Sequence, residues 1–141
     1  MKQEDKDLLL KDLCGRLPYD IKCKIEMWIG CDVCTIYNIN SIGYVEIVED
    51  SDTNGISIEK IKPYLFPLSS MTEEQEEEYG KCYDIDLANG TKNLYDRLDG
   101  KKVINGYPMY NHIDWLNKNH FDYRGLIEKG LAIDCTNLNI Y

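Results

Sequence analysis

The sequence lacks the clustered lysine and arginine residues that nucleic-acid binding requires. Lysine and arginine number 16 against 25 aspartates and glutamates, which gives a net charge of −9. Sequence-independent binding to phosphate backbones depends on a concentration of basic side chains, and anionic membrane surfaces attract proteins by the same force. Direct binding to nucleic acid or to a membrane surface is therefore disfavoured, whereas a basic partner protein would be attracted.

Long apolar segments are also missing. No apolar run approaches the roughly 18 residues that a membrane-spanning helix needs. The apolar stretch Leu8–Leu10 is too short for the centre of a signal peptide. We therefore expect a cytoplasmic protein, in which the six cysteines are thiols. The chain also has no glycine-rich phosphate loop of the GxGxxG or GxxxxGK[ST] type.

What the sequence does contain is the composition of a folded domain. Hydrophobic residues make up 43% of the 141 residues, which suffices for the core of one ordinary domain. Eleven tyrosines and two tryptophans add large side chains with polar tips. Such residues suit shallow cores and contact surfaces.

The first sixty residues predict a helix followed by a small antiparallel sheet. A helix is expected over 5–14, closed by Gly15, because apolar residues recur there at helical spacing. These apolar residues are Leu10, Leu13, Cys14 and Leu17. Alternation of period two and short turns predict a β-meander curled into a partial barrel, with the helix over one side. The predicted strands are 20–27, 33–39, 42–48 and 56–58.

Two prolines mark the end of this predicted sheet. Pro63 and Pro67 lack the N–H group that a central strand needs, and they also exclude a helix interior. We therefore expect 61–69 to be extended or loosely turned.

Helices are expected to dominate the rest of the chain. Thr72 and Gln75 form a capping box, which starts a helix. Weak periodicity over 84–109 predicts loop or a small hairpin. Asp122 is expected to cap a short helix that Gly130 ends. The remaining predicted elements are helices over 112–119 and 124–129 and a strand over 131–133.

Together these elements predict an α+β fold. We expect 1–141 to form a single compact unit with two sub-parts. An N-terminal helix and antiparallel β-meander (1–70) would pack with a mostly helical C-terminal part (71–141).

Cysteine spacing offers one metal-binding hypothesis. Cys31 and Cys34 form a CxxC pair, which can supply half of a zinc site. Structural zinc sites usually show a second close pair of ligands, and this sequence has none. A thioredoxin-like redox role is disfavoured, because the motif lies between two predicted strands. No cofactor is predicted.

Aromatic residues and both histidines gather towards the C-terminus. Loops rich in aromatic residues and methionine, such as 105–115, suit protein contacts or a ligand pocket, although this loop could instead plug the core. Arg124 is expected to bond to a carboxylate or to backbone carbonyls. The predicted ligand or partner surface consists of Tyr107, Tyr110, His112, Trp115, His120, Tyr123 and Arg124.

Three stretches resemble, in amino-acid sequence and in their order along the chain, segments of a known group of proteins. They are LCGRLPYDIK at 13–22, IKPYLFPLSSMTEEQ at 61–75 and IDWLNKNHFDYRGLIEKGLAI at 113–133, about a third of the chain. Together they resemble a family of small uncharacterised proteins encoded in gut Bacteroidetes prophages and other mobile elements. The resemblance implies one shared fold and a phage or mobile-element setting, but no activity, cofactor or site residue.

These observations favour a non-catalytic interaction protein of phage or mobile-element origin. It would act in the cytoplasm of a bacterial host on a host or phage protein, and an oligomer is compatible with the sequence. One alternative is a protein that sequesters a small nucleotide-like ligand in counter-defence, because the aromatic loop could stack a base. A second alternative is a small hydrolase that uses His112 or His120.

Overall fold

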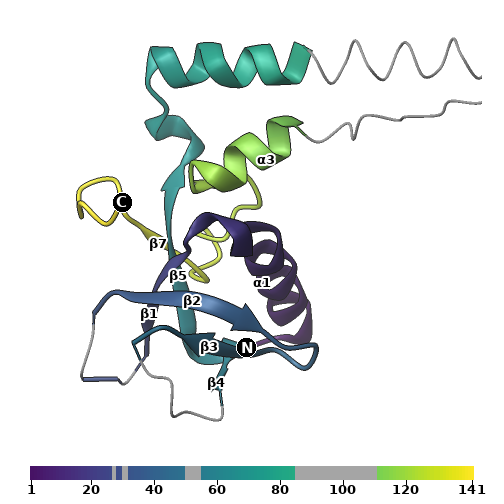
Figure 1. Ribbon diagram of the computed structural model, residues 1–141, viewed down its shortest axis with the longest axis vertical. Coiled ribbons are helices and arrows are strands. Elements are labelled where there is room, and N and C mark those ends of the chain that lie inside the picture. The colour runs from purple at the N-terminus through teal and green to yellow at the C-terminus, as the bar shows by residue number, and fades with distance from the viewer. Residues whose placement is uncertain (27, 30–31, 50–54, 85–110) are drawn as a thin grey trace, which may run out of the picture. The chain divides into compact units, whose positions relative to one another are not determined.

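The computed structural model describes residues 1–26, 28–29, 32–49, 55–84 and 111–141 (Figure 1). By its internal contacts the chain divides into two units. We call residues 1–70 with 120–141 the sheet unit, and residues 71–119 the helical unit. The described elements form an α+β fold, as predicted. None of the described helices is long and apolar enough to cross a membrane.

The first helix, α1 (Gln3–Arg16), is longer than predicted, and its buried face matches the predicted one only in part. Gly15 does not end it; the 3-10 turn η1 (Leu17–Tyr19), which contains Pro18, follows directly. The buried residues recur at helical spacing, but two of them are charged. The buried stripe is Leu9, Asp12, Leu13 and Arg16. Of the predicted face, Leu13 is buried and Leu10 and Leu17 pack against the core, whereas Cys14 is exposed.

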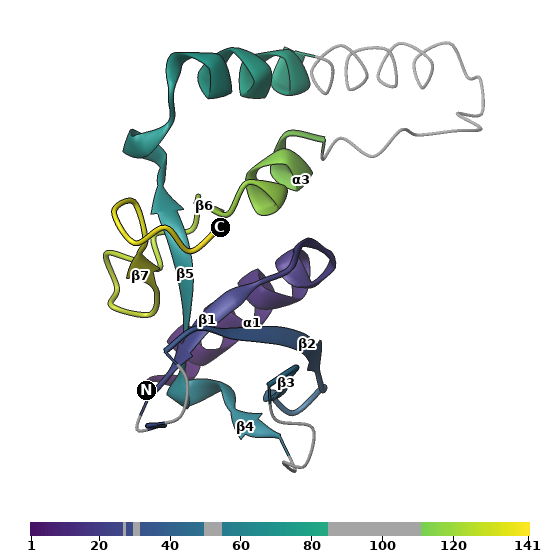
Figure 2. The ribbon, with the colours of Figure 1, turned by 60° about the vertical axis from the view of Figure 1, so that its left-hand side comes forward.

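The described residues of the sheet unit form one sheet of seven strands. The first four follow one another as the predicted antiparallel meander, and α1 covers one face of it (Figures 1 and 2). Hydrogen-bonded neighbours follow the path β4-β3-β2-β1-β5-β6, and β7 also pairs with β5. The strands are β1 (Lys22–Ile25), β2 (Cys34–Ile39), β3 (Tyr44–Ile47), β4 (Ile56–Ser57), β5 (Ile61–Pro67), β6 (Phe121–Asp122) and β7 (Ile133–Asp134).

The presence of β5 corrects the prediction that its prolines keep this segment out of the sheet. Pro63 faces Cys23 of β1. The Glu26 N–H donates to the Lys60 carbonyl at 2.8 Å, and hydrogen-bonded pairs alternate along antiparallel strands. Pro63 therefore occupies a pair that exchanges no backbone hydrogen bond. Its ring nitrogen faces the opposite edge, where β7 begins to pair only at Tyr64, so no ladder bond is lost.

The C-terminal Tyr141 lies where β1 and β5 separate. Its hydroxyl accepts from the Lys22 N–H at 3.1 Å and donates to the Tyr64 carbonyl at 3.0 Å. By the alternation of the ladder, these two backbone groups would form the next β1–β5 hydrogen bond. Although 42% of the residue is exposed, burial raises the pKa of its hydroxyl, which therefore remains a protonated donor.

Strand β6 continues along the same edge of β5 beyond Tyr141. The Phe66 N–H donates to the His120 carbonyl at 2.9 Å, on the side of β5 that also faces β1. The Leu65 carbonyl points to the other edge and accepts from the Cys135 N–H at 3.0 Å. Strands β6 and β7 therefore flank β5 on opposite sides, both parallel to it (Figure 2).

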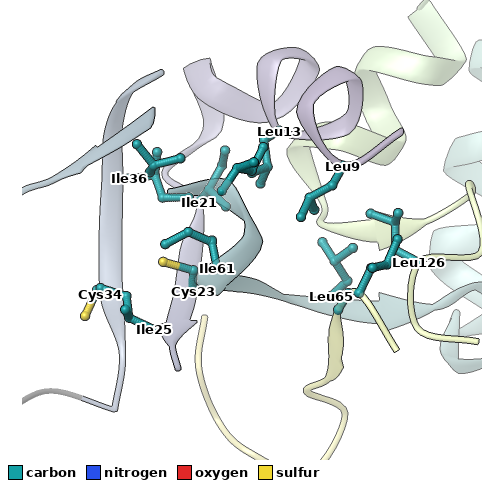
Figure 3. Close-up of a cluster of buried hydrophobic side chains, with 14 of the residues drawn as sticks. Leu9, Leu13, Ile21, Cys23, Ile25, Cys34, Ile36, Ile61, Leu65 and Leu126 are labelled. Atoms are coloured by element: carbon teal, nitrogen blue, oxygen red, sulfur yellow. The ribbon is translucent and has the colours of Figure 1, made fainter. Parts of the chain in front are cut away.

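The hydrophobic core lies between α1 and the sheet. Leu9 and Leu13 of α1 point towards the strands, and Leu126 from the C-terminal segment lies near Leu9 and Leu65 (Figure 3). Fully burying each large apolar side chain stabilises the fold by about 1.5–3 kcal/mol. The remaining cluster members are Ile21, Cys23, Ile25, Cys34, Ile36, Val45, Ile47, Ile58, Ile61, Leu131 and Ala132.

The C-terminal segment differs from its prediction. Residues 124–129 form bends and turns rather than a helix, because so short a segment gains few helical hydrogen bonds for the cost of nucleation. Gly130 closes the segment with a φ of +71°, as its predicted role requires. The last strand is β7 at 133–134, and Leu131 and Ala132 are core residues before it.

The helical unit contains two described helical segments. Residues 73–84 are helical, and the predicted capping box is confirmed. The Thr72 N–H donates to Gln75 Oε1 at 3.0 Å, and the Gln75 N–H donates to Thr72 Oγ1 at 3.2 Å. Helix α3 (Asn111–Lys118) confirms the helix predicted over 112–119. From residue 85 onwards, the prediction for 84–109 lies outside the described residues.

Replacing Tyr141 by phenylalanine tests the bridge between β1 and β5. Tyr141→Phe leaves the Lys22 N–H and the Tyr64 carbonyl without their shared partner. We expect the free energy of unfolding, measured by urea denaturation, to fall by about 2 kcal/mol. Tyr44→Phe, at an exposed tyrosine of β3, should change it by less than about 0.5 kcal/mol. Equal effects of the two variants would show that the bridge contributes nothing specific.

Candidate functional site

The residues predicted to form one functional surface are divided between the two units. Tyr107 and Tyr110 lie outside the described residues. His112 and Trp115 belong to the helical unit, whereas His120, Tyr123 and Arg124 belong to the sheet unit. The structure therefore places the last three in one unit, where Arg124 contacts Tyr123, and describes the first two separately.

In the helical unit, His112 and Trp115 take part in an aromatic cluster. The ring of Tyr79 lies 6.2 Å from His112 and 5.8 Å from Trp115 between ring centres. Tyr83 meets His112 edge-on at 5.3 Å. These distances are typical of packed aromatic pairs. The two predicted site residues thus join α3 to the helix at 73–84.

In the sheet unit, a buried ion pair lies beneath the predicted site residues. Asp12 and Arg16 have no exposed surface. Arg16 Nε donates to Asp12 Oδ2 at 2.7 Å, and Arg16 Nη2 donates to Asp12 Oδ1 at 3.0 Å. Arg16 Nη2 also donates to the Phe121 carbonyl at 2.7 Å. The pair therefore connects α1 to β6.

Arg124 approaches the same carboxylate. Its Nε lies 3.3 Å from Asp12 Oδ1, as an ion pair rather than an aligned hydrogen bond. This contact confirms the prediction that Arg124 bonds to a carboxylate. The guanidinium groups of Arg16 and Arg124 lie 5.4 and 4.8 Å from the centre of the Tyr123 ring, within the range of cation–π interactions. Tyr123 and Arg124 are thus anchored to α1.

His120 is a buried structural residue. Only 8% of it is exposed, and its ring stacks on Tyr141 with the ring centres 3.7 Å apart. Its backbone φ of +60° is uncommon for a residue other than glycine. Burial, reinforced by the positive charge of Arg16, lowers the pKa of His120 to about 4. The ring is therefore neutral at pH 7.

Asp122 organises the surface segment that follows β6. Its carboxylate accepts hydrogen bonds from the backbone N–H groups of Arg124 at 3.3 Å, Leu126 at 3.0 Å and Ile127 at 2.8 Å. It therefore caps the segment, as predicted, although the segment is a series of turns. The backbone passes through Gly125 with a φ of +72°, which glycine adopts without strain. We call residues 122–128 the capped loop.

A pocket of about 350 Å³ opens between the capped loop and the end of β5. This volume lies within the range of about 300–1,000 Å³ that is usual for small-ligand sites. On the β5 side the wall is the 3-10 turn η3 (Leu68–Ser70), where the Ser70 hydroxyl donates to the Pro67 carbonyl at 2.7 Å. The lining residues all belong to the sheet unit and are Pro67, Leu68, Ser69, Asp122, Tyr123, Gly125, Ile127 and Glu128.

The pocket combines apolar walls with a negatively charged rim. Leu68 is 46% exposed, and Glu128 is exposed beside the opening. The described residues offer the Glu128 carboxylate no hydrogen-bond or ion-pair partner. Nearby cations are engaged elsewhere, Arg124 with Asp12 and Lys129 with Asp5, whose Oδ1 lies 3.9 Å from the Lys129 Nζ. The pocket therefore presents an uncompensated negative charge.

The cysteine motif does not extend this site. Cys34 is fully buried in β2 within the hydrophobic core, and Cys31 lies outside the described residues. In the described ranges, no group of three histidine, cysteine, aspartate or glutamate side chains could hold a metal ion.

Sequence reasoning found only part of the pocket. Tyr123 was predicted as a site residue, and Asp122 was predicted as a cap. The other lining residues come from the end of β5 with η3 and from the capped loop, which are far apart in the sequence. Pro67 could have indicated the wall at η3, because a proline at this position ends β5.

Comparison of the chain with models of known protein families, with curated protein sequences and with solved structures gives no significant match.

The buried ion pair can be tested by neutralising one partner. Asp12→Asn leaves Arg16 buried beside a neutral group, and we expect the free energy of unfolding to fall by about 3 kcal/mol. Asp7→Asn, at an exposed position of the same helix, should change it by less than about 0.5 kcal/mol. A double variant, Asp12→Leu with Arg16→Met, removes both charges and should recover much of the loss. Urea denaturation measures the free energy of unfolding of all three variants. An unchanged value for Asp12→Asn would refute the stabilising role of the pair.

The lowered pKa of His120 predicts a loss of stability in mild acid. The unfolded chain binds a proton near pH 6.5, whereas the folded protein resists it down to about pH 4. Between these values the unfolded state binds more protons, so stability falls as the pH decreases, by up to ~3 kcal/mol. The NMR titration of the His120 ring should have its midpoint near pH 4.

Removing the imidazole isolates this contribution. His120→Gln should flatten the slope of stability against pH between 6.5 and 4. A His120 midpoint near its ordinary value of about 6.5 would contradict the prediction.

Proposed function

We propose that the protein is a non-catalytic interaction protein that binds its partner at the pocket between η3 and the capped loop. The observation that supports this function best is a pocket with walls that are fixed before binding. Asp122 holds the capped loop through three backbone hydrogen bonds, and Ser70 holds η3. A preorganised site loses less conformational entropy when a partner binds.

The chemistry of the pocket favours binding over hydrolysis. A hydrolase needs a nucleophile within reach of a general base. Ser69 supplies a hydroxyl at the pocket wall, but no histidine or lysine lines the pocket. His120 is stacked on Tyr141 instead. The negative rim also disfavours a nucleotide, because its phosphates would face Glu128.

The biological setting that we propose rests on the resemblance of the three stretches at 13–22, 61–75 and 113–133. In that setting the protein is of phage or mobile-element origin and acts in the cytoplasm of a bacterial host. Its partner is a host or phage protein. A net charge of −9 favours a basic partner through long-range attraction.

A comparison of bait proteins tests the proposed site. Ser69→Arg places a long side chain in the pocket, whereas Ser41→Arg makes the same change at an exposed turn between β2 and β3. A partner captured from the lysate of a gut Bacteroidetes bacterium should bind the wild type and Ser41→Arg alike. Its affinity for Ser69→Arg, measured with purified components by calorimetry, should fall at least roughly tenfold. A partner that binds all three proteins equally would overturn the proposal.

A further inference from the structure

We propose that the pocket receives the side chain of one lysine or arginine from a basic segment of the partner protein. This inference rests on the proposed function and specifies which chemical group the pocket recognises. It follows from three features of the pocket: its apolar walls, its unpaired carboxylate and its size.

The apolar walls match the stem of a basic side chain. Pro67, Leu68 and Ile127 supply aliphatic surface on the two sides of the pocket. Lysine and arginine bury their methylene stems along such surface while the charged end stays near water. A volume of about 350 Å³ leaves room for one long side chain together with water.

The charged end of the ligand would meet Glu128 at the rim. Since the described residues provide this carboxylate with no partner, a bound cation would form a new charge-assisted hydrogen bond without breaking an existing one. The Ser69 hydroxyl on the opposite wall is a further acceptor. Asp122 adds negative charge to the lining, although its oxygens already accept backbone hydrogen bonds.

Other ligands fit these features less well. A phosphate group would be repelled by Glu128 and Asp122. A purely aliphatic side chain would cover the walls but would remove water from the Glu128 carboxylate without replacing its hydrogen bonds. The net charge of −9 adds attraction for a basic segment at distances beyond the pocket.

NMR titration of the full-length, ¹⁵N-labelled protein tests this inference directly. The probes are N-acetyl-lysine methylamide, N-acetyl-arginine methylamide and N-acetyl-norleucine methylamide, the last of which has an aliphatic chain without the cation. The two basic probes should bind with millimolar affinity and shift the amide signals of Ser69, Gly125 and Glu128. Norleucine should bind at least about fivefold more weakly, because it lacks the charge-assisted bond.

Two charge-matched variants complete the test. Glu128→Gln should weaken binding of both basic probes about fivefold or more. Glu46→Gln removes the same charge from β3, which is separated from β5 by β2 and β1, and should leave the affinity unchanged. Equal affinity for norleucine, an unaffected Glu128→Gln, or shifts that map away from the pocket would each overturn the inference.

Failure of this inference can be distinguished from failure of the proposed function. If a captured partner depends on Ser69 but not on Glu128, the pocket is the binding site and the cation inference is wrong. If the basic probes bind as expected but no partner distinguishes Ser69→Arg from Ser41→Arg, the inference stands as a property of the pocket and the proposed function is wrong.

Discussion

The buried pair of Asp12 and Arg16 is the interaction on which the arrangement of the sheet unit depends. It lies on the face of α1 that would otherwise be an apolar stripe. Arg16 also bonds the carbonyl of Phe121, and Asp12 attracts Arg124. Removing two charges from water is costly, and the cost is offset only by close contacts and further hydrogen bonds. These contacts fix both β6 and the start of the capped loop on α1, and so they place one wall of the pocket.

Strand β5 is the second feature on which the arrangement of the sheet unit depends. It pairs with β1 at its beginning and with β6 and β7 further along. Tyr141 bridges the point on the edge of β5 where pairing with β1 stops and pairing with β6 follows. The pocket opens where β5 itself ends, at Pro67 and η3. Strand β5 therefore positions both walls of the pocket. Its end leads into η3, and its pairing with β6 places the start of the capped loop.

Patterns among neighbouring residues predicted the elements that are determined by short-range interactions. The meander strands β1–β4 lie within the predicted runs, and the Thr72–Gln75 capping box and α3 follow short-range hydrogen bonding and helical spacing. The buried face of α1 was predicted correctly at Leu13 but without Asp12 and Arg16, because charged residues are expected in solvent. Asp12 and Arg16 are buried because they pair with each other and with groups far along the chain.

Long-range pairing explains the remaining differences. Pro63 fits a central strand because of the register of β5 against β1, which the sequence of β5 does not reveal. Strands β6 and β7 have two residues each, too few to show a period. The pocket joins residues 67–69 to 122–128, so its walls meet only in the folded chain. Tyr123 and Asp122 were predicted, but the lining residues Pro67, Leu68 and Ser69 on the other wall were not predicted as site residues.

Amide hydrogen exchange tests most directly the claim that the buried pair holds the pocket wall. The N–H groups of Leu126 and Ile127 bond to Asp122 within the capped loop. In the wild type they should exchange slowly. In Asp12→Asn their protection should fall by more than that of Ile36 and Val45 in the sheet. Equal loss at all four amides, or unchanged protection at Leu126 and Ile127, would contradict the account.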